Sequence, residues 1–289
     1  NAMALVLDPG GRAPTLLDPH GGLADLQQRE LRFLHSHSLR DDPTRLIRAA
    51  RYAARLGFRL SKASELQAHL TLEEWPWSWR PTDAPLEAPV SLSTRLRMEL
   101  ELLLTREPWC EALTLLKAWG GLVMLDPTLQ ADQRWRRRLH WAQRLQLPLL
   151  PALIAVVDNP LAIAQRLQLP HGQQRMLGQW MHLRERLEAL TSSGVDAADQ
   201  HSSPSRWTQW LEQGACTPEA VGLALATGFG PRRPLLRWWL RWRHAVSPVS
   251  AKCLMAQGIQ AGPALGSRMR ELRLDVIDES ERRNGSASS

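Results

Sequence analysis

Residues 38–58, SLRDDPTRLIRAARYAARLGF, combine a pair of aspartates with a predicted helix that is rich in arginine. Asp42 followed by proline is typical of a helix start, because a carboxylate accepts hydrogen bonds from the first free N–H groups and proline suits the first helical position. Gly57 is suited to end the helix. Between them lie four arginines and no acidic residue, whereas a solvent-exposed helix usually places Glu four residues from Lys or Arg. The imbalance predicts that this helix faces a polyanion.

Spacing divides this helix into two faces. The apolar face, which is expected to pack on a core, has Leu46, Ile47, Ala50, Ala53 and Ala54. The polar face has Arg45, Arg48, Tyr52 and Arg55, with Arg51 beside it. A capped basic helix exposed to solvent is the alternative interpretation of the polar face.

Composition limits the classes of protein to consider. The 289 residues are 44% hydrophobic and 22% charged, which suits a globular protein of two or more compact units. The formal net charge of +7 favours nucleic acid or another polyanion as partner. The three cysteines are odd in number and far apart, which predicts a reducing compartment and no disulfide framework or zinc site. Because the chain has no bilayer-spanning apolar run and no signal-peptide pattern, we expect a cytoplasmic protein without a membrane partner.

The chain starts with strand-like segments and continues with helical ones. Residues 3–18 predict a hairpin of two short strands, and residues 31–34 predict a further short strand. Residues 90–104 predict a helix, with one face formed by Leu92, Leu96, Leu100 and Leu103. The segments 73–89 and 191–205 are expected to be connectors. The string QRLQLP occurs at 143–148 and at 165–170 and is expected to form two similar helix ends. The predicted fold class is therefore mainly α and multi-part, with an incomplete β region in front.

Two segments, DPHGGLADLQQRELR (18–32) and DDPTRLIRAARYAARLGF (41–58), resemble the class II family of bacterial tRNA nucleotidyltransferases (CCA-adding enzymes) and poly(A) polymerases. Members have D-P-x-G-G-x-x-D-L and then E-D-P-x-R-x-x-R-A-x-R-F-x-x-x-x-G-F. RLRMEL (95–100) resembles the later R-I-x-x-E-L segment, and residues 252–272 resemble the family's tail pattern. The opening NAMAL resembles the end of R-R-D-F-T-x-N-A. The matches follow the family order along almost the whole chain.

The resemblance implies a helical neck, body and tail that follow a small β-hairpin remnant of a nucleotidyltransferase head. Residues 1–38 would be the head remnant, 39–126 the neck with the nucleotide-selecting helix, 127–245 the RNA-binding body and 246–289 the tail. The family's metal-binding segments, G-S/G-x-x-R-D and D-x-D, have no counterpart in this sequence. We therefore expect no catalytic or metal-binding residue here, Mg²⁺ only in a full-length enzyme, and a missing or separate catalytic head.

In the family, the Asp and Arg of E-D-P-x-R form a template for the incoming base, which implies that Asp42 and Arg45 bind the nucleotide. Asp41 stands where the family usually has Glu, and Arg48 resembles the arginine that reaches the sugar and phosphates. A carboxylate acceptor beside a guanidinium donor suits cytosine and adenine, which offer an amino donor beside a ring-nitrogen acceptor. Uracil and guanine present a carbonyl at that place, so the expected substrates are CTP and ATP.

The resemblance also implies that four charged residues hold the nucleotide-selecting helix in place. These are Asp18, Asp25, Arg95 and Glu99. The alternatives are an ordinary glycine turn at residues 18–26 and a plain surface ion pair between Arg95 and Glu99, which are four residues apart.

Two later basic segments are candidates for binding RNA. Residues 231–245 predict a helix whose basic stripe is formed by Arg233, Arg237, Arg241 and His244. The tail places Arg268 and Arg270 on a helix that follows small residues. Such arginines attract the sugar-phosphate backbone, here expected to be that of the tRNA 3′ end and acceptor stem. For residues 231–245 the alternative is a tryptophan-packed core helix with extended arginines.

The predicted function is that of a tRNA nucleotidyltransferase, which adds CCA, CC or A to tRNA 3′ ends. The alternatives are a poly(A) polymerase and a non-catalytic helical RNA-binding protein derived from this family. The sequence leaves the choice among CC, A and CCA addition open.

Overall fold

The computed structural model describes residues 3–7, 10, 13–76, 84, 88–192, 203–213 and 216–286. These residues are mainly helical, as predicted, and their strands form two short pairs. The chain divides into two compact units, residues 1–136 with 149–174, and residues 137–148 with 175–289. The division into head remnant, neck, body and tail stays a prediction.

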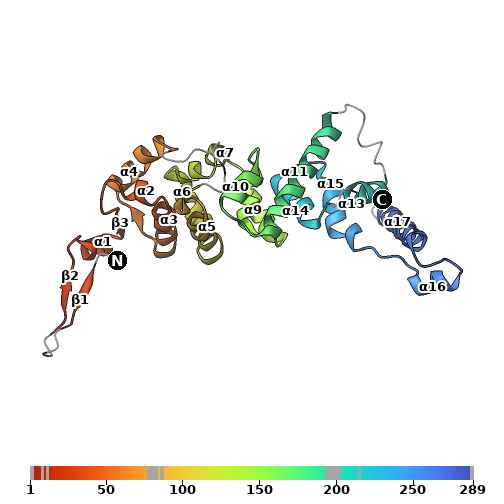
Figure 1. Cartoon of the computed structure of the whole chain (residues 1–289), viewed down its shortest axis with the longest axis horizontal. Helices are drawn as coiled ribbons and strands as arrows, with labels where there is room; N and C mark the ends of the chain where they lie inside the picture. Colours follow the sequence, from red (N-terminus) through yellow and green to blue (C-terminus); the bar gives the residue numbers. More distant parts are fainter. Residues whose placement is uncertain are drawn as a thin grey trace. The chain divides into compact units, whose positions relative to one another are not determined.

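The first unit contains two strand pairs and a series of short helices (Figure 1). Its elements are β1 (Ala4–Val6), β2 (Thr15–Leu17), α1 (Gly22–Gln28), β3 (Glu30–Leu31), α2 (Ser38–Asp41), α3 (Thr44–Leu56), β4 (Arg59–Leu60), α4 (Lys62–Glu73), η2 (Val90–Leu92), α5 (Thr94–Arg106), α6 (Trp109–Ala118), η3 (Gly121–Met124), α7 (Pro127–Ala131), α9 (Leu149–Ile154) and α10 (Pro160–Arg166).

The predicted hairpin is confirmed, whereas the predicted strand at residues 31–34 is shorter and lies further toward the N-terminus. Strands β1 and β2 pair antiparallel, with Leu5 opposite Leu16, and all six of their residues are exposed. Strand β3 pairs in parallel with β4, which follows α3 directly. Strand β4 could not be predicted from the sequence, because a strand of two residues is too short to show an alternating pattern.

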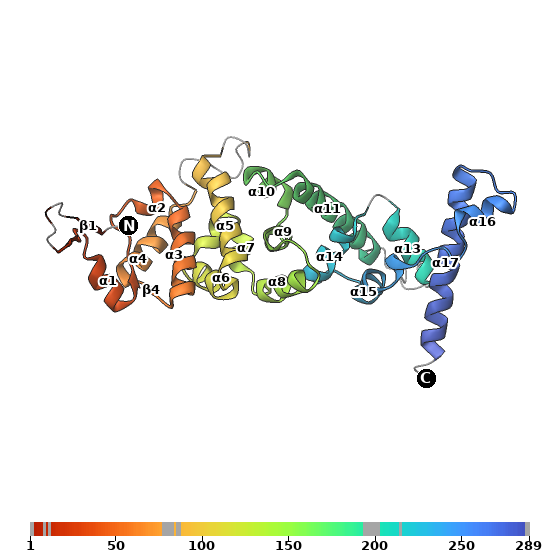
Figure 2. The ribbon, with the colours of Figure 1, turned by 90° about the horizontal axis from the view of Figure 1, so that it is seen from below.

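Helix α3 packs against α5 and α6 in the core of the first unit (Figures 1 and 2). Most of the apolar face of each of these helices is buried, as the helical spacing predicted. The buried residues include Leu46, Ala50, Ala53, Leu96, Leu100, Leu103, Leu113 and Leu116. The polar face of α3 is therefore fixed relative to α5, which positions the site described below.

The two QRLQLP strings form matching helix ends, as predicted. The first follows α8 (Trp135–Arg144) and the second follows α10. Gln146 and Gln168 both have positive φ angles, 57° and 54°. In each copy the next leucine donates a backbone hydrogen bond five residues back, from Leu147 to Ala142 and from Leu169 to Ala164, both at 2.9 Å. This is the left-handed cap that satisfies the last carbonyls of a helix.

The described elements of the second unit are all helical. They include most of α8 and α11 (His171–Ser192), followed by α13 (Pro204–Glu212), α14 (Pro218–Thr227), α15 (Arg232–Leu240), η4 (Trp242–His244), α16 (Ala251–Ala256) and α17 (Pro263–Ser286). Helix α13 packs against α15 and α17, and Trp207, Trp238 and Trp242 are buried there.

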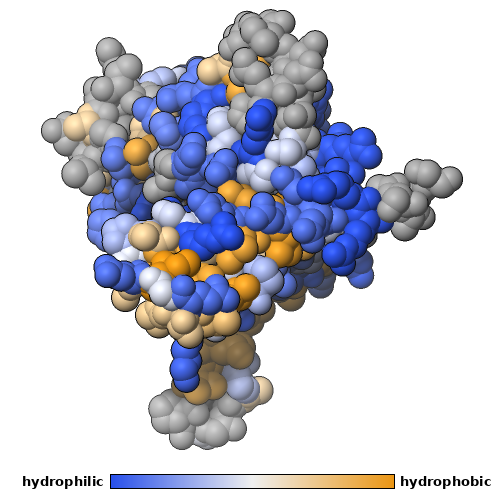
Figure 3. Space-filling view, turned by 90° about the vertical axis from the view of Figure 1, so that its right-hand side faces the viewer, coloured by the Kyte–Doolittle hydropathy of each residue, from blue (hydrophilic) through white to orange (hydrophobic). Residues whose placement is uncertain are grey.

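One face of the molecule is mostly polar. Figure 3 shows a face on which hydrophilic side chains surround smaller areas of hydrophobic ones. Within the described part of the chain, none of the helices has the length and apolar character needed to cross a membrane.

Candidate functional site

Asp42 forms the N-terminal cap of α3. Its Oδ1 accepts hydrogen bonds from the backbone N–H of Thr44 at 3.1 Å and from the Thr44 hydroxyl at 2.6 Å. Pro43 already has helical dihedral angles, φ −60° and ψ −23°, so it acts as the first residue of the helix. At the other end Gly57 has φ 66° and ends the helix. Both predicted ends of the arginine-rich helix are therefore confirmed.

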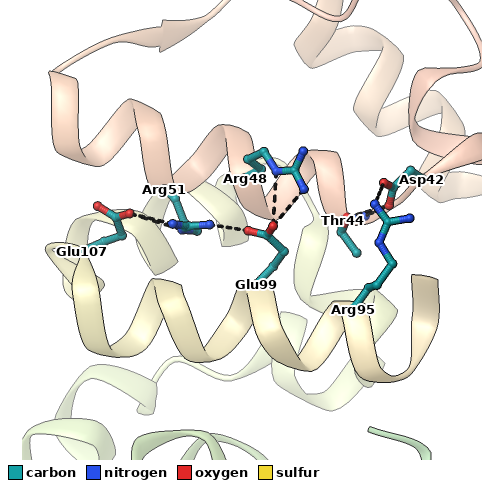
Figure 4. Close-up of polar contacts among 7 residues, drawn as sticks. All are labelled: Asp42, Thr44, Arg48, Arg51, Arg95, Glu99 and Glu107. Carbon is teal, nitrogen blue, oxygen red and sulfur yellow. Dashed lines mark hydrogen bonds and ion pairs between the residues drawn. The ribbon is translucent and has the colours of Figure 1, made fainter. Parts of the chain in front are cut away.

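Arg95 of α5 contacts the second carboxylate oxygen of Asp42 (Figure 4). Its Nη2 lies 2.8 Å from Asp42 Oδ2, and only 7% of Asp42 is exposed. Both oxygens of this carboxylate are thus hydrogen-bonded within the protein. An ionised carboxylate has about four acceptor positions, so a ligand could still use those that Thr44 and Arg95 leave.

Glu99, one turn after Arg95 on α5, bridges two arginines of α3 (Figure 4). Its Oε1 accepts from Arg48 Nη2 at 2.9 Å and from Arg48 Nε at 3.2 Å, while its Oε2 accepts from Arg51 Nη1 at 2.5 Å. The hydrogen bond to Glu99 raises the pKa of Arg48 above its usual value. Arg48 keeps 41% of its side chain exposed, whereas Glu99 keeps only 13%.

Glu107 extends this network at the C-terminal end of α5. Its Oε1 accepts from Arg51 Nε at 3.2 Å and from Arg51 Nη2 at 3.1 Å, and its side chain is only 1% exposed. Arg55 Nε lies 3.6 Å from Glu107 Oε2. Arg51 therefore lies between two carboxylates, one from Glu99 and one from Glu107 (Figure 4).

These contacts correct the prediction that the arginine helix has an unbalanced charge. Arg48, Arg51 and Arg55 are paired with carboxylates of α5 and its C-cap. The acidic partners lie about fifty residues further along the chain, so charge counting within one helix could not find them. Arg45 differs, because it has no carboxylate within ion-pair distance among the described residues.

A pocket of about 380 Å³ lies beside the polar face of α3. Apolar residues of β3, of the segment after it, of α3 and of β4 complete the wall, and the polar lining consists of Arg32, His35, Ser38, Arg45, Arg48 and Tyr52. Asp42 does not belong to this lining. The pocket combines three guanidinium groups with aromatic and apolar surface, which suits an anionic ligand with a flat ring.

Asp18 and Asp25 organise the glycine turn and α1. Asp18 accepts from the backbone N–H groups of Gly22 at 2.6 Å and of Leu23 at 2.8 Å. These hydrogen bonds, chiefly the one from Leu23, lower the pKa of Asp18 below its usual value. Asp25 Oδ2 lies 2.9 Å from Arg32 Nη2. Asp25 thereby contacts one of the pocket arginines, and neither aspartate forms a recorded polar contact with α3 among the described residues.

Arg95 and Glu99 do not form the surface ion pair that their spacing allowed. Each contacts α3 or its cap instead, Arg95 through Asp42 and Glu99 through Arg48 and Arg51. Asp41 is half exposed, and its Oδ2 lies 3.8 Å from His35 Nε2.

Four residues that the structure brings to this site were not predicted from the sequence as site residues. These are Arg32, His35, Tyr52 and Glu107. Arg32 is the last residue of the segment 18–32 that resembles the nucleotidyltransferase family, so this resemblance could have indicated it as a site residue. Nothing in the sequence around His35 or Glu107 indicated their partners, because those partners lie on other elements.

The His, Cys, Asp and Glu side chains of the described residues are the possible metal ligands. Among them, no group of three or more His, Cys, Asp and Glu side chains is placed to hold a metal ion. The residues described here therefore do not form a binding site for Mg²⁺.

The basic stripe predicted at residues 231–245 is interrupted. Helix α15 ends at Leu240, and Arg241 leaves the helical conformation with φ −131° before the turn η4. Arg237 and Arg241 pair with Glu281 of α17, at 3.2 and 3.6 Å. Arg233 is exposed, and His244 follows in η4. The prediction of one continuous helix was wrong, because the chain leaves the helical conformation at Arg241. The ion pairs of Arg237 and Arg241 connect the segment to α17.

The tail arginines lie on α17, as predicted. Arg268 forms a surface pair with Glu271 at 3.0 Å. Arg270 lines a pocket of about 300 Å³ between α13 and α17, together with Gln209 and Arg273. Arg270 and Arg268 are both exposed.

The chain is similar in sequence to known tRNA nucleotidyltransferases. The chain is 33% identical over 279 residues to the CC-adding tRNA nucleotidyltransferase of Deinococcus radiodurans, a match that covers 94% of this chain and 57% of the relative. It is 28% identical over 277 residues to the CCA-adding enzyme of Pseudomonas putida, covering 91% of this chain and 69% of that enzyme. The chain thus spans little more than half of the length of the CC-adding relative. No protein-family model matches the chain.

Solved structures share the fold. A CCA-adding enzyme in complex with CTP has a TM-score of 0.67 at 22% identity, covering 96% of this chain and 66% of that one. The CCA-adding enzyme of Thermotoga maritima in complex with tRNA has a TM-score of 0.63 at 19% identity, covering 91% of this chain and 64% of that one.

Proposed function

Because the chain is homologous to bacterial tRNA nucleotidyltransferases over nearly its whole length, we propose that it carries the nucleotide-selecting and tRNA-binding parts of such an enzyme. The enzyme adds CCA, CC or A to the 3′ end of tRNA during tRNA processing. A reducing, cytoplasmic compartment suits both this role and the free cysteines.

The nucleotide binds at the N-terminal part of α3. Arg45 lines the pocket there, and Asp42 lies just before the helix and caps it. Arg45 donates hydrogen bonds to the base. Asp42 accepts a hydrogen bond from the exocyclic amino group of cytosine or adenine, while its carboxylate keeps the hydrogen bonds from Thr44 and Arg95. Asp41, which lies 3.8 Å from His35 of the pocket lining, is a further nucleotide contact, and Arg48 contacts the sugar and phosphates of CTP or ATP.

The packing between α3 and α5 keeps these groups in place. From α5, Arg95 contacts the N-cap residue Asp42, and Glu99 contacts Arg48 and Arg51 of α3. Asp18 and Asp25 act on the other side of the pocket, where Asp25 fixes Arg32. A site held by charge-assisted hydrogen bonds needs little rearrangement when a ligand binds.

The tRNA partner is contacted through its 3′ end and acceptor stem. Arg233, Arg237, Arg241, Arg268 and Arg270 supply positive charge for the sugar-phosphate backbone. Because Arg237 and Arg241 pair with Glu281, they contribute less to the attraction of RNA phosphates. Arg233 is then the residue of the stripe that contributes most to RNA binding.

Catalysis needs groups that the described residues do not offer. Nucleotidyl transfer of this kind uses Mg²⁺ to neutralise charge on the triphosphate and activate the attacking hydroxyl. We propose that the metal-binding carboxylates lie outside the residues described here, and that these residues alone transfer no nucleotide.

The homology with the CC-adding relative carries the proposal. The test is incorporation of labelled CTP and ATP into tRNA that lacks its 3′ CCA, in the presence of Mg²⁺. One sample holds the chain alone, and a second holds the chain joined to the head of the Deinococcus relative. We expect incorporation only in the second sample.

Sequencing the tRNA 3′ ends then assigns CC, A or CCA addition, and long runs of A would identify a poly(A) polymerase instead. Incorporation by the chain alone would show that a metal site has been overlooked. Failure of the chain to bind tRNA at all would contradict the proposed function.

A further inference from the structure

Arg45 is held by two acceptors that both contact the same nitrogen. Its Nη1 lies 3.1 Å from the backbone oxygen of Ser38 and 3.5 Å from Nε2 of His35. Arginine only donates hydrogen bonds, so Nε2 of His35 must be the acceptor and the ring proton must be on Nδ1. Both N–H groups of Nη1 are thereby used within the protein.

The backbone of His35 is fixed from two sides. Its N–H donates to the hydroxyl of Ser38 at 3.3 Å, and its carbonyl oxygen accepts from the amide of Gln67 on α4 at 2.9 Å. Gln67 also contacts the carbonyl oxygen of Ser36. The loop that carries His35 is therefore fastened to α4, although the ring itself is half exposed at the pocket wall.

We propose that His35 is a positioning residue that orients Arg45 for nucleotide selection. With Nη1 anchored, the Nε and Nη2 donors of Arg45 have no recorded partner among the described residues and form one planar edge. That edge is the one with which a guanidinium makes two parallel hydrogen bonds to a ligand. The inference rests on the proposed function and adds a residue to which neither the resemblance nor the comparisons assign a role.

Charged groups of both signs lie around His35. Arg45 and Arg32 are positive groups in the same pocket, and Arg48 lies one turn beyond Arg45. Asp41 is the nearby negative group, but its Oδ2 is 3.8 Å from Nε2 and thus beyond hydrogen-bond distance. Tyr52 completes the ionisable groups of the lining.

The experiment measures the affinity of the chain for CTP, ATP, UTP and GTP by competition with a fluorescent ATP analogue. The variants are His35→Leu, which removes the acceptor, and His35→Gln, whose amide oxygen can replace Nε2. His37→Leu is the matched control, since the same change is made two residues away at a histidine that does not line the pocket.

We expect His35→Leu to weaken CTP and ATP binding about five- to tenfold, the effect of one hydrogen bond, with little change for UTP and GTP. His35→Gln should recover most of the loss, and His37→Leu should match the wild type. If His35→Leu leaves the C/A preference intact while Arg45→Ala abolishes it, the inference is wrong and the proposed function stands. If the wild-type chain binds all four nucleotides equally, both the inference about His35 and the proposed function are wrong.

A second measurement does not depend on nucleotide binding. At pH 8, above the range in which imidazoles usually titrate, ¹⁵N NMR of the His35 ring should show the proton on Nδ1. A proton on Nε2 would overturn the contact with Arg45 and the inference with it.

Discussion

Glu107 accepts hydrogen bonds from both Nε and Nη2 of Arg51, although 56 residues separate the two in the sequence. The contact joins the C-terminal end of α5 to the middle of α3, and the Glu107 side chain is almost completely buried. This buried ion pair links the two helices on the side where Arg48, Arg51 and Arg55 lie.

Removing one partner of this ion pair should destabilise the folded protein. We predict that Glu107→Ala lowers the free energy of unfolding by about 3 kcal/mol, because it leaves a buried guanidinium with less compensation. The measurement is urea denaturation followed by circular dichroism. The matched control is Glu101→Ala, at a partly exposed residue of the same helix that lies 3.9 Å from Arg97. That change should cost about 0.5 kcal/mol or less, and equal effects of the two variants would show that Glu107 has no special role.

Acid should release the turn that Asp18 holds. Its pKa is below the usual value of 3.8, because Leu23 and Gly22 donate hydrogen bonds to the ionised carboxylate. A carboxyl whose pKa is lower in the folded protein stabilises it fully above the usual value, and this stabilisation is lost as the pH falls below 3.8 through the lowered pKa.

We therefore predict that the stability difference between wild type and Asp18→Asn is constant near neutral pH and shrinks below pH 3.8. A ¹³C NMR titration of the Asp18 carboxyl gives its pKa directly. A value at or above the usual one would contradict the hydrogen bonds from Gly22 and Leu23.

The contribution of the second unit to tRNA binding is best tested at Arg233. Arg237 and Arg241 pair with the largely buried Glu281, so changing them would also disturb α17. Arg233 is exposed, and we predict that Arg233→Ala weakens tRNA binding and reduces the slope of log affinity against log salt by about one. Binding is measured by filter retention at several salt concentrations. Arg106→Ala, at an exposed arginine of α5, is the control, and an equal change in both variants would argue against a specific RNA face.

The helices of this fold could be predicted because their signals are local. The leucines at four-residue spacing in residues 90–104 mark a buried face, and Asp42 and Gly57 mark the two ends of α3. The two QRLQLP strings predicted two similar helix ends for the same reason, since a left-handed cap depends on a few neighbouring residues.

The site was only partly predictable, because its chemistry depends on pairs of residues from different elements. Arg48 and Arg51 have no acidic neighbour in their own helix, and the sequence does not reveal that Glu99 and Glu107 face them. The same limit applies to His35, whose role depends on where its loop meets Arg45.

The central claim is that Arg45 selects the nucleotide, and the affinity of the chain for all four nucleoside triphosphates tests it most directly. We predict that the wild-type chain prefers CTP and ATP, and that Arg45→Ala loses about 1.5–3 kcal/mol, or roughly ten- to hundredfold, for these two alone. Its affinity for tRNA, measured at two salt concentrations, should stay nearly unchanged. An Arg45→Ala variant that loses tRNA affinity but keeps the preference for CTP and ATP would contradict the account and identify α3 as a phosphate-binding face.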